Sequence, residues 1–332
     1  MNTVLTRVPV RIPLAGGGTD LPLYSSRFGG FLLSAAINKY VYVLANRPQM
    51  TDTIRVKTSV EQEVTCLDEI KYDVARESLR YCGIKNNIQV TFEGDVPHGT
   101  GLGTSGSYTV GLIKAFSALK GKILTSQEIA EAACYVEMEM LKLPVGKQDQ
   151  YMAAFGGVRI LKISTEGRVD VENPQISWHT LDNLRGSMLF FFTGQRHDSN
   201  KILGAQKILV DSGNQELLNY YHKIKSIGLD ILEALQRGDL IAFGELLHQH
   251  WLTKRNLAGG VTNPAIDRLY DLAMADGALG GKIMGSGGGG FFMFFCRPGR
   301  QEELRATMQK QGLRELSFDY DFTGATVVYA SQ

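Results

Sequence analysis

The residue types of an anion-binding loop occur together in the segment Pro97-His-Gly-Thr-Gly-Leu-Gly-Thr-Ser-Gly-Ser107. A strand-like run, Ile88–Phe92, leads into it, and a helical pattern from about Ser105 to Leu119 follows it. Glycines permit positive φ and let the backbone approach a ligand closely. A helix N-terminus adds unpaired N–H groups and the positive end of the helix dipole. The loop contains no Lys or Arg, so we expect N–H groups and hydroxyls to hold a phosphate.

Three other interpretations of this loop compete with phosphate binding. The spacing Gly101-x-Gly-x-x-Gly106 fits the dinucleotide fingerprint, but that fingerprint needs an acidic residue at the end of the next strand, about 20 residues on. That distance falls in another helical pattern, Ser126–Leu141. A Walker loop needs a Lys-Ser/Thr pair after its second glycine, and the segment has none. A glycine-rich connection without a ligand stays open on this loop alone.

Three further clusters combine glycine with polar residues. The first is Ala15-Gly-Gly-Gly-Thr-Asp-Leu-Pro22, and the second is Gly146-Lys-Gln-Asp-Gln150. The third runs from Gly280 to Gly290 and ends in four consecutive glycines. Such a run costs conformational entropy, which favours a close approach to backbone or ligand, although a tight strand crossing also explains it. The acids have a structural alternative too, since Asp149 and Asp20 stand where each could cap a following helix.

These clusters, in this order, resemble the GHMP kinase superfamily, which includes galactokinases, homoserine kinases and mevalonate kinases. The resemblance covers almost the whole chain, and its signature is the Pro-x-x-x-Gly-Leu-Gly-x-Ser core of the glycine loop. Within the superfamily, the segments Ala15–Pro22, Asn38–Val43, Gly146–Gln150 and Gly260–Pro264 look like those of the D-glycero-D-manno-heptose 7-phosphate kinases. The loop departs from the usual Gly-Ser-Ser at Thr104, which keeps a hydroxyl.

The resemblance implies an α+β protein with the two-domain GHMP kinase fold. Its N-terminal domain, residues 1–175, would be ribosomal-protein-like and would carry the ATP phosphate loop. Its C-terminal domain, residues 176–332, would be ferredoxin-like, and the active site would lie between the two. The implied reaction uses ATP and Mg²⁺ to phosphorylate the anomeric hydroxyl of heptose 7-phosphate, giving the 1,7-bisphosphate for GDP-heptose and capsule or lipopolysaccharide biosynthesis.

The resemblance also implies a role for individual residues. Asp149 would face the acceptor hydroxyl as base or orienting charge, with Arg11 paired to it. Ser105 and Glu137 would bind Mg²⁺, with Glu139 as an alternative ligand and a solvated helix face as the structural alternative for Glu137. The residues expected to bind ATP are Pro97, Gly99, Gly101, Leu102, Gly103, Thr104, Ser105, Gly106 and Ser107. The residues expected to bind the sugar are Gly17, Gly18, Thr19, Asp20, Lys147, Gln148, Gly285, Ser286 and Gly287.

Two other functions stay open at this stage. One is a kinase of an unphosphorylated sugar such as L-fucose, and the other is a galactokinase-like sugar sensor with little catalysis. The complete set of Arg11, Ser105, Glu137 and Asp149 favours an enzyme over the sensor. A heptose 7-phosphate kinase also needs cationic groups for the terminal phosphate, and the candidates are Arg27, Lys39, Arg196, His197 and Lys254.

Composition fits a cytoplasmic enzyme. The chain has 332 residues, 44% of them hydrophobic, which is enough for a large core and two domains. A net charge of +1 and scattered basic residues give no field for nucleic acid, and no apolar run is long enough to span a membrane. The four cysteines are widely separated, as expected of reduced thiols. We expect a small-molecule sugar phosphate as the partner, and a homodimer stays open.

Hydrophobic periodicity predicts the elements that position these clusters. In the first half we expect strands at Tyr40–Ala45, Ile54–Val60, Ile88–Phe92 and Val158–Ile163, and helices at Leu67–Tyr81, Ser105–Leu119 and Ser126–Leu141. In the second half we expect a strand at Met188–Thr193, helices between about 200 and 275, a strand after the last glycine cluster, a helix at Gly299–Gln311 and a strand at Ala325–Ala330. The signals do not alternate in strict βαβ order, which favours α+β.

Overall fold

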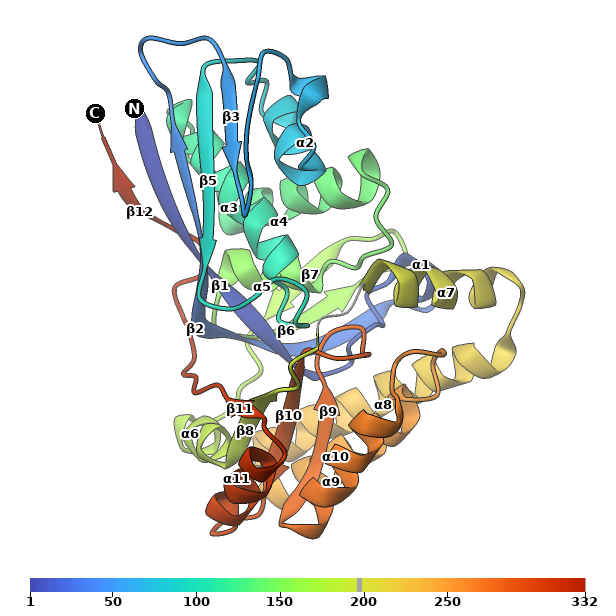
Figure 1. The fold of residues 1–332 in the computed structure, drawn as a ribbon. Helices are drawn as coiled ribbons and strands as arrows, with labels where there is room; N and C mark the ends of the chain where they lie inside the picture. The colour runs from blue at the N-terminus through green and yellow to red at the C-terminus, as the bar shows by residue number, and fades with distance from the viewer. Residues whose placement is uncertain (196–198, 332) are drawn as a thin grey trace.

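Two β-sheets organise the protein (Figure 1). The structure is a computed structural model that describes residues 1–195 and 199–331. Eight strands form the first sheet and four antiparallel strands form the second. The predicted α+β class is confirmed.

The eight-stranded sheet is built on the long antiparallel pair β1 (Thr3–Ala15) and β2 (Gly30–Asn46). Along β2, β6 (Val158–Ile163) pairs with the first part and β5 (Ile88–Gly94) pairs with the last part. The sheet is completed by β3 (Ile54–Lys57), β4 (Glu61–Val64), β7 (Val169–Glu172) and β12 (Thr326–Ala330). Its helices are α1 (Pro22–Phe28), α2 (Asp73–Tyr81), α3 (Thr104–Leu119), α4 (Ser126–Cys134) and α5 (Gln148–Phe155).

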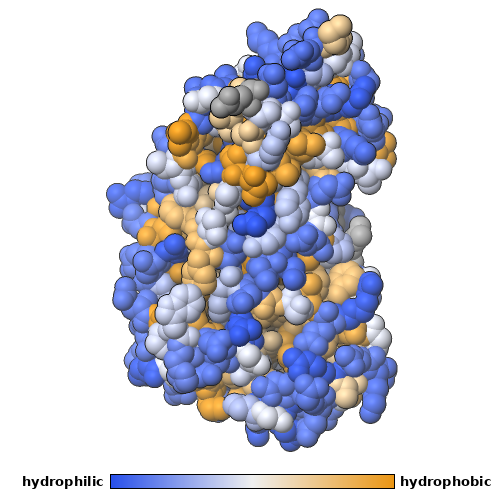
Figure 2. Space-filling model, turned by 90° about the vertical axis from the view of Figure 1, so that its left-hand side faces the viewer, coloured by the Kyte–Doolittle hydropathy of each residue, from blue (hydrophilic) through white to orange (hydrophobic). Residues whose placement is uncertain are grey.

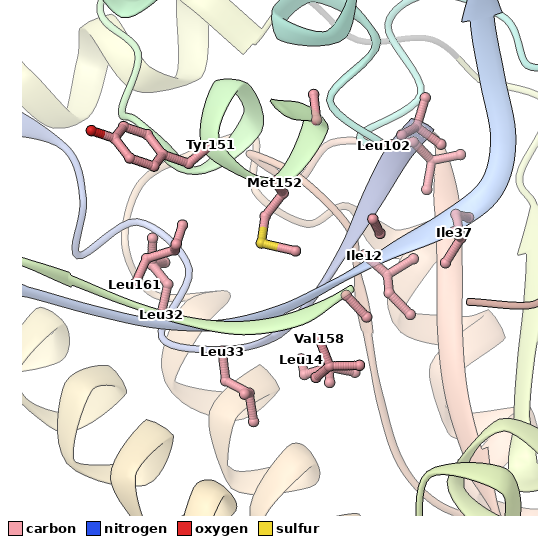
Figure 3. Packing of buried hydrophobic residues seen from close by; sticks show 14 of the residues in the cluster. Ile12, Leu14, Leu32, Leu33, Ile37, Leu102, Tyr151, Met152, Val158 and Leu161 are labelled. Atoms are coloured by element: carbon pink, nitrogen blue, oxygen red, sulfur yellow. The ribbon is translucent and has the colours of Figure 1, made fainter. Parts of the chain in front are cut away.

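The sheet is buried on both faces where β1, β2 and β6 meet. Consecutive residues of a strand point to opposite faces, and Leu32 and Leu33 do so here (Figure 3). Met152 of α5 packs toward the sheet from one side, whereas Leu33 extends from the other (Figure 3). Burial on both faces explains why Gly30–Ile37 is continuously buried instead of alternating with exposed positions. This rigid region carries Arg11 on β1.

The four-stranded sheet has the order β11 (Arg314–Glu315), β8 (Met188–Phe192), β10 (Phe291–Cys296) and β9 (Ala278–Ile283). Around it are α6 (Trp178–Ser187), α7 (Ser199–Asp211), α8 (Gln215–Arg237), α9 (Leu240–Lys254), α10 (Pro264–Ala275) and α11 (Gln301–Lys310). Helix α9 lies directly against β9. The two elements are so close at Gly280 that an added Cβ would lie 2.2 Å from the carbonyl oxygen of Gly244. Core residues from both sheets, such as Val10 and Phe295, belong to one apolar cluster.

Several predicted elements are shorter than expected. The strand predicted at Ile54–Val60 ends at Lys57, and the helix predicted at Leu67–Tyr81 begins at Asp73 after a short 3-10 turn. The helix predicted at Ser126–Leu141 leaves α-helical geometry at Tyr135 and continues as a π-helix, Tyr135–Met140. Such segments are rare and often mark functional sites.

The chain ends lie close together, because β12 pairs with β1 at the edge of the first sheet (Figure 1). The closing strand therefore belongs to the first sheet, although it falls within the segment 176–332 that was predicted as the second domain. The boundary near residue 175 stays a prediction.

The face of the molecule that Figure 2 shows is mainly hydrophilic, with an apolar patch in its upper half. Within the described residues, no helix has the length and apolarity needed to cross a membrane.

Candidate active site

A cavity of about 430 Å³ is lined by residues of both halves of the chain. The first half contributes Arg11 of β1, the glycine loop before α3, Glu137 of the π-helix and Asp149 of α5. The second half contributes Lys282 of β9 together with residues of α7, α8 and α9. Residues of all four glycine-containing clusters line this cavity, although the clusters are far apart in the sequence.

The glycine loop has the backbone geometry that the sequence predicts. Gly99, Gly101 and Gly103 all have positive φ, between 75° and 82°. The space around Gly101 requires glycine as well, because a Cβ there would lie 2.4 Å from the carbonyl oxygen of Met284. Helix α3 begins at Thr104, directly after Gly103, so its free N–H groups point toward the cavity that Thr104 and Ser105 line.

Asp149 and Arg11 form an ion pair beside this loop. Arg11 Nε donates to Asp149 Oδ1 at 2.8 Å, and Nη2 lies 2.6 Å from the same oxygen. The remaining guanidinium nitrogen, Nη1, donates to the carbonyl oxygen of Gly101 at 2.6 Å. Asp149 makes no capping hydrogen bond at the start of α5, so the cap interpretation is wrong. A Cβ on Gly106 would lie 2.7 Å from the Asp149 Cβ, so this glycine makes room for the acid.

Asp20 lies on the same side of the cavity. Its carboxylate is buried and accepts a hydrogen bond from the backbone N–H of Gln148 at 3.0 Å. Burial raises the pKa of Asp20, and the neighbouring charge of Asp149 adds to the increase. Helix α1 starts after Leu21 without a side-chain cap, so Asp20 does not act as the predicted alternative, an N-cap. Gly146 has to be glycine, since a Cβ would lie 2.0 Å from Asp20 Oδ2.

Glu137 is buried at the edge of the cavity, with an exposed fraction of 2%, so the alternative of a solvated helix face is wrong. Its two oxygens accept hydrogen bonds from Thr109 Oγ1 and, at 2.9 Å, from Gln150 Nε2. Burial raises the pKa of Glu137 to about 7, and the charge of Asp149 acts in the same direction. The other acidic candidate, Glu139, is exposed and pairs with Lys142.

Most of the predicted site residues line the cavity, and they are Arg11, Gly17, Gly18, Asp20, Gly99, Gly101, Gly103, Thr104, Ser105, Gly106, Glu137, Gln148, Asp149, Gly285 and Ser286. Pro97, Leu102, Ser107, Thr19, Lys147 and Gly287 are not among the lining residues.

Three of these six residues have side chains that are engaged elsewhere. Thr19 Oγ1 lies 2.8 Å from the carbonyl oxygens of Gly16 and Phe31, so it holds the turn between β1 and β2. Ser107 Oγ lies 3.0 Å from the Pro9 carbonyl oxygen. Lys147 Nζ donates to the Gly167 carbonyl oxygen at 2.7 Å and pairs with Glu131. The predicted ligand-binding roles of these side chains are therefore not supported by their positions.

The other three residues, Leu102, Pro97 and Gly287, make contacts within the protein instead of lining the cavity. Leu102 is fully buried in the apolar core, and Pro97 accepts a hydrogen bond from Thr100 Oγ1 at its carbonyl oxygen. Gly287 lies against Val261, whose carbonyl oxygen would be 2.7 Å from an added Cβ.

Sequence reasoning missed a basic wall of the cavity, defined by His250, Lys254 and Lys282. Of these residues only Lys254 was a candidate for the terminal phosphate. Arg27 is exposed beside Phe28 and does not line the cavity, and neither does Lys39. Arg196 and His197 lie outside the described residues. Gln206 and Tyr221 also line the cavity, joined by a hydrogen bond of 2.8 Å, and no sequence signal indicated them.

The chain matches known proteins over nearly its full length. The profile of the GHMP kinase N-terminal domain matches residues 69–157, and that of the GHMP kinase C-terminal region matches residues 231–313. A D-glycero-alpha-D-manno-heptose 7-phosphate kinase of Campylobacter jejuni is 32% identical, covering 97% of both chains.

Two further comparisons concern a solved structure and a longer protein. The crystal structure of a D-glycero-D-manno-heptose 1-phosphate kinase from Bacteroides thetaiotaomicron has a TM-score of 0.80 at 28% identity, covering 98% of this chain and all of that one. An L-fucokinase/L-fucose-1-P guanylyltransferase of Bacteroides fragilis is 28% identical over 88% of this chain but only 34% of its own length. The two family matches and the full-length similarity to the Campylobacter jejuni enzyme show that the chain belongs to the GHMP kinases. This is a family of ATP-dependent phosphotransferases that act on alcohol groups.

Proposed function

We propose that the protein transfers the γ-phosphoryl group of ATP to the anomeric hydroxyl of D-glycero-D-manno-heptose 7-phosphate. The product is the 1,7-bisphosphate, which would serve GDP-heptose and surface polysaccharide biosynthesis. The observation that carries the proposal is the position of the Arg11–Asp149 pair in one cavity with the N-terminus of α3. The full-length similarity to a heptose 7-phosphate kinase supports the choice of sugar.

The nucleotide phosphates would bind at the glycine loop. Gly99, Gly101 and Gly103 leave the backbone open to a ligand, and the N-terminus of α3 provides N–H donors and a positive dipole end. The hydroxyls of Thr104 and Ser105 line the cavity at this helix end. Donors fixed in this way stabilise charge that develops on the transferring phosphoryl group.

Glu137 and Ser105 suit a magnesium ion, because Mg²⁺ prefers hard oxygen ligands and usually takes one carboxylate besides phosphates and water. Both residues line the cavity near the glycine loop. The neighbouring Gln150 also lines the cavity and has a buried Oε1 without a hydrogen-bond partner in the described part of the chain. When bound, Mg²⁺ neutralises phosphate charge and orients the γ-phosphoryl group.

Asp149 would receive the acceptor. Arg11 occupies Oδ1, and within the described residues Oδ2 accepts no hydrogen bond, so this oxygen can face the anomeric hydroxyl. As the acceptor oxygen bonds to the γ-phosphorus and the bond to the bridging oxygen of ADP breaks, the hydroxyl proton passes to Asp149. Arg11 holds the carboxylate in place through this ion pair. Asp20 would bind sugar hydroxyls, since a carboxylate accepts hydrogen bonds from vicinal diols.

A kinase of an unphosphorylated sugar is the second candidate, favoured by the similarity to the fucokinase-containing protein. A panel of sugars and sugar phosphates with Mg-ATP, analysed by phosphorus NMR, separates the two. We expect heptose 7-phosphate to give a new anomeric phosphate signal and to be preferred over free heptose by orders of magnitude in kcat/KM. Equal rates for both, or a preference for L-fucose, would overturn the substrate assignment. Absence of turnover with every sugar would favour the sensor function.

A further inference from the structure

The basic wall of the cavity places two buried lysines where the described residues supply no carboxylate partner. Lys254 and His250 come from α9, and Lys282 comes from β9, which lies against α9 (Figure 1). The three residues are 6%, 1% and 1% exposed, and all line the cavity. Burying an ammonium group costs free energy unless it finds compensating partners.

The hydrogen bonds of the wall leave donors unused. Lys254 Nζ donates to the carbonyl oxygens of Ile283 and Gly285, at 2.9 and 2.6 Å, and Lys282 Nζ donates to that of Leu14 at 3.1 Å. An ammonium group has three donors, so the bonds among the described residues use two of those on Lys254 and one of those on Lys282. Within the described residues, no carboxylate pairs with either lysine.

Two uncharged groups at this wall also lack partners. Both ring nitrogens of His250 are buried without a hydrogen bond in the described part of the chain, and the same holds for the hydroxyl oxygen of Ser286. Buried polar groups are normally hydrogen-bonded, so a cluster of unpaired ones that faces a cavity indicates a missing ligand. A purely structural role, in which the lysines fasten β9 to neighbouring carbonyls, leaves His250 and Ser286 unexplained.

The electrostatics identify the sign of that ligand. Burial lowers the pKa of Lys254 to about 7 and that of Lys282 well below its ordinary value, and the charge of Arg11 adds to both decreases. The carboxylates Asp20 and Glu137 also line the cavity, but among the described residues neither forms an ion pair or hydrogen bond with these lysines. An anion seated against the lysines therefore relieves repulsion, whereas sugar hydroxyls and a metal suit the carboxylates.

We infer that Lys254, Lys282, His250 and Ser286 form the binding site for the terminal phosphate of the acceptor sugar. This inference rests on the proposed function and names the groups that distinguish a sugar phosphate from a free sugar. The alternative source of a phosphate is the nucleotide. The glycine loop and the N-terminus of α3 already supply donors for nucleotide phosphates, so the acceptor is the better match. Gly285, which accepts from Lys254, packs against Gly101 of that loop, so the test also measures nucleotide binding.

The test uses Lys282→Met and Lys254→Met, which remove the charge but keep an unbranched side chain. A charge-assisted hydrogen bond is worth about 10- to 100-fold in binding. Each variant should therefore reduce the preference for heptose 7-phosphate over free heptose, measured as the ratio of their kcat/KM values, by about that factor. Affinity for a non-hydrolysable ATP analogue should stay at the wild-type value. Melting temperatures establish that each variant is folded.

Lys225→Met is the matched control. Lys225 also donates to two backbone carbonyls, those of Phe28 and Gly29, but it does not line the cavity. Its substitution should leave the preference ratio unchanged. An unchanged ratio in both Lys282→Met and Lys254→Met overturns the inference. Weaker binding of the ATP analogue with an unchanged sugar ratio overturns it as well, because the site would then belong to the nucleotide.

Failure of the proposed function is distinguished by the wild-type protein. If the wild type prefers a free sugar, the substrate proposal fails whatever the variants do. The phosphate site is then decided by calorimetric titration with heptose 7-phosphate and, separately, with inorganic phosphate. Binding to the wild type that is at least about 10-fold weaker in Lys282→Met supports the site. No binding, or equal binding to both proteins, overturns it.

Discussion

Arg11 contacts a single carboxylate oxygen of Asp149 through two nitrogens, with Nε at 2.8 Å and Nη2 at 2.6 Å from Oδ1. The third nitrogen holds the carbonyl oxygen of Gly101. One side chain therefore fixes the acid of α5 to both β1 and the glycine loop. Arg11 is only 5% exposed, and this buried arrangement positions Asp149 relative to the place where the phosphoryl group would bind.

Asp149→Asn should retain nucleotide binding and lose phosphoryl transfer, because the amide cannot take up a proton. We expect kcat to fall by about 100-fold or more, the range of an acid–base group. Steady-state kinetics measure the loss, and titration with a non-hydrolysable ATP analogue provides the control. Turnover near the wild-type rate would show that Asp149 is not the base.

Glu137→Gln and Ser105→Ala should raise the Mg²⁺ concentration needed for the half-maximal rate, since each removes a hard oxygen ligand. Glu139→Gln is the matched control, because Glu139 lies on the same π-helix but is exposed and paired with Lys142. Rates are measured over a range of free Mg²⁺ at fixed MgATP. Identical Mg²⁺ dependence in all three variants would remove Glu137 and Ser105 from the metal site.

Local sequence patterns predict the glycine loop and the start of α3 well. The glycine spacing and the helical period place α3 within one residue of its observed start, because both are properties of a continuous segment. The pairing of Arg11 with Asp149 came from the family resemblance, since no local pattern joins residues 138 positions apart.

The basic wall and the pairing of the closing strand could not be predicted from local sequence patterns. Lys282 stands among glycines and apolar residues, and its burial depends on α9, which packs over β9 through Gly244 and Gly280. The partner of β12 is β1, at the opposite end of the chain. Periodicity describes one element at a time, so these long-range contacts become visible only in the folded chain.

Gly101→Ala should destabilise the contact between the two glycine clusters. Left-handed backbone costs a non-glycine residue about 1–2 kcal/mol, and the added Cβ would also lie 2.4 Å from the Met284 carbonyl oxygen. The loss of unfolding free energy should therefore exceed that of Gly121→Ala, where φ is also positive but no atom lies within 4 Å. Chemical denaturation compares the two variants. Equal losses would mean that the contact with Met284 adopts a different geometry.

Lys254→Met should stabilise the folded protein more at pH 6 than at pH 9. Burial lowers the folded-state pKa of Lys254 to about 7, below the ordinary 10.5 of a lysine. The unfolded chain therefore binds the proton more strongly, so the charge opposes folding fully below pH 7, and the penalty declines as pH rises toward 10.5. The stabilisation gained by the substitution should differ by about 3 kcal/mol between the two pH values.

Denaturation of wild type and Lys254→Met at both pH values measures this difference. The charge of Lys254 also lowers the pKa of Lys282 and of His250, so the measured difference includes the response of these two neighbours. Lys85→Met is the control, because Lys85 is exposed and its ammonium group stays in water when the chain folds. Its effect on stability should be the same at pH 6 and pH 9. A gain for Lys254→Met that does not depend on pH would mean that Lys254 keeps its proton throughout, held by a charge that the free protein supplies.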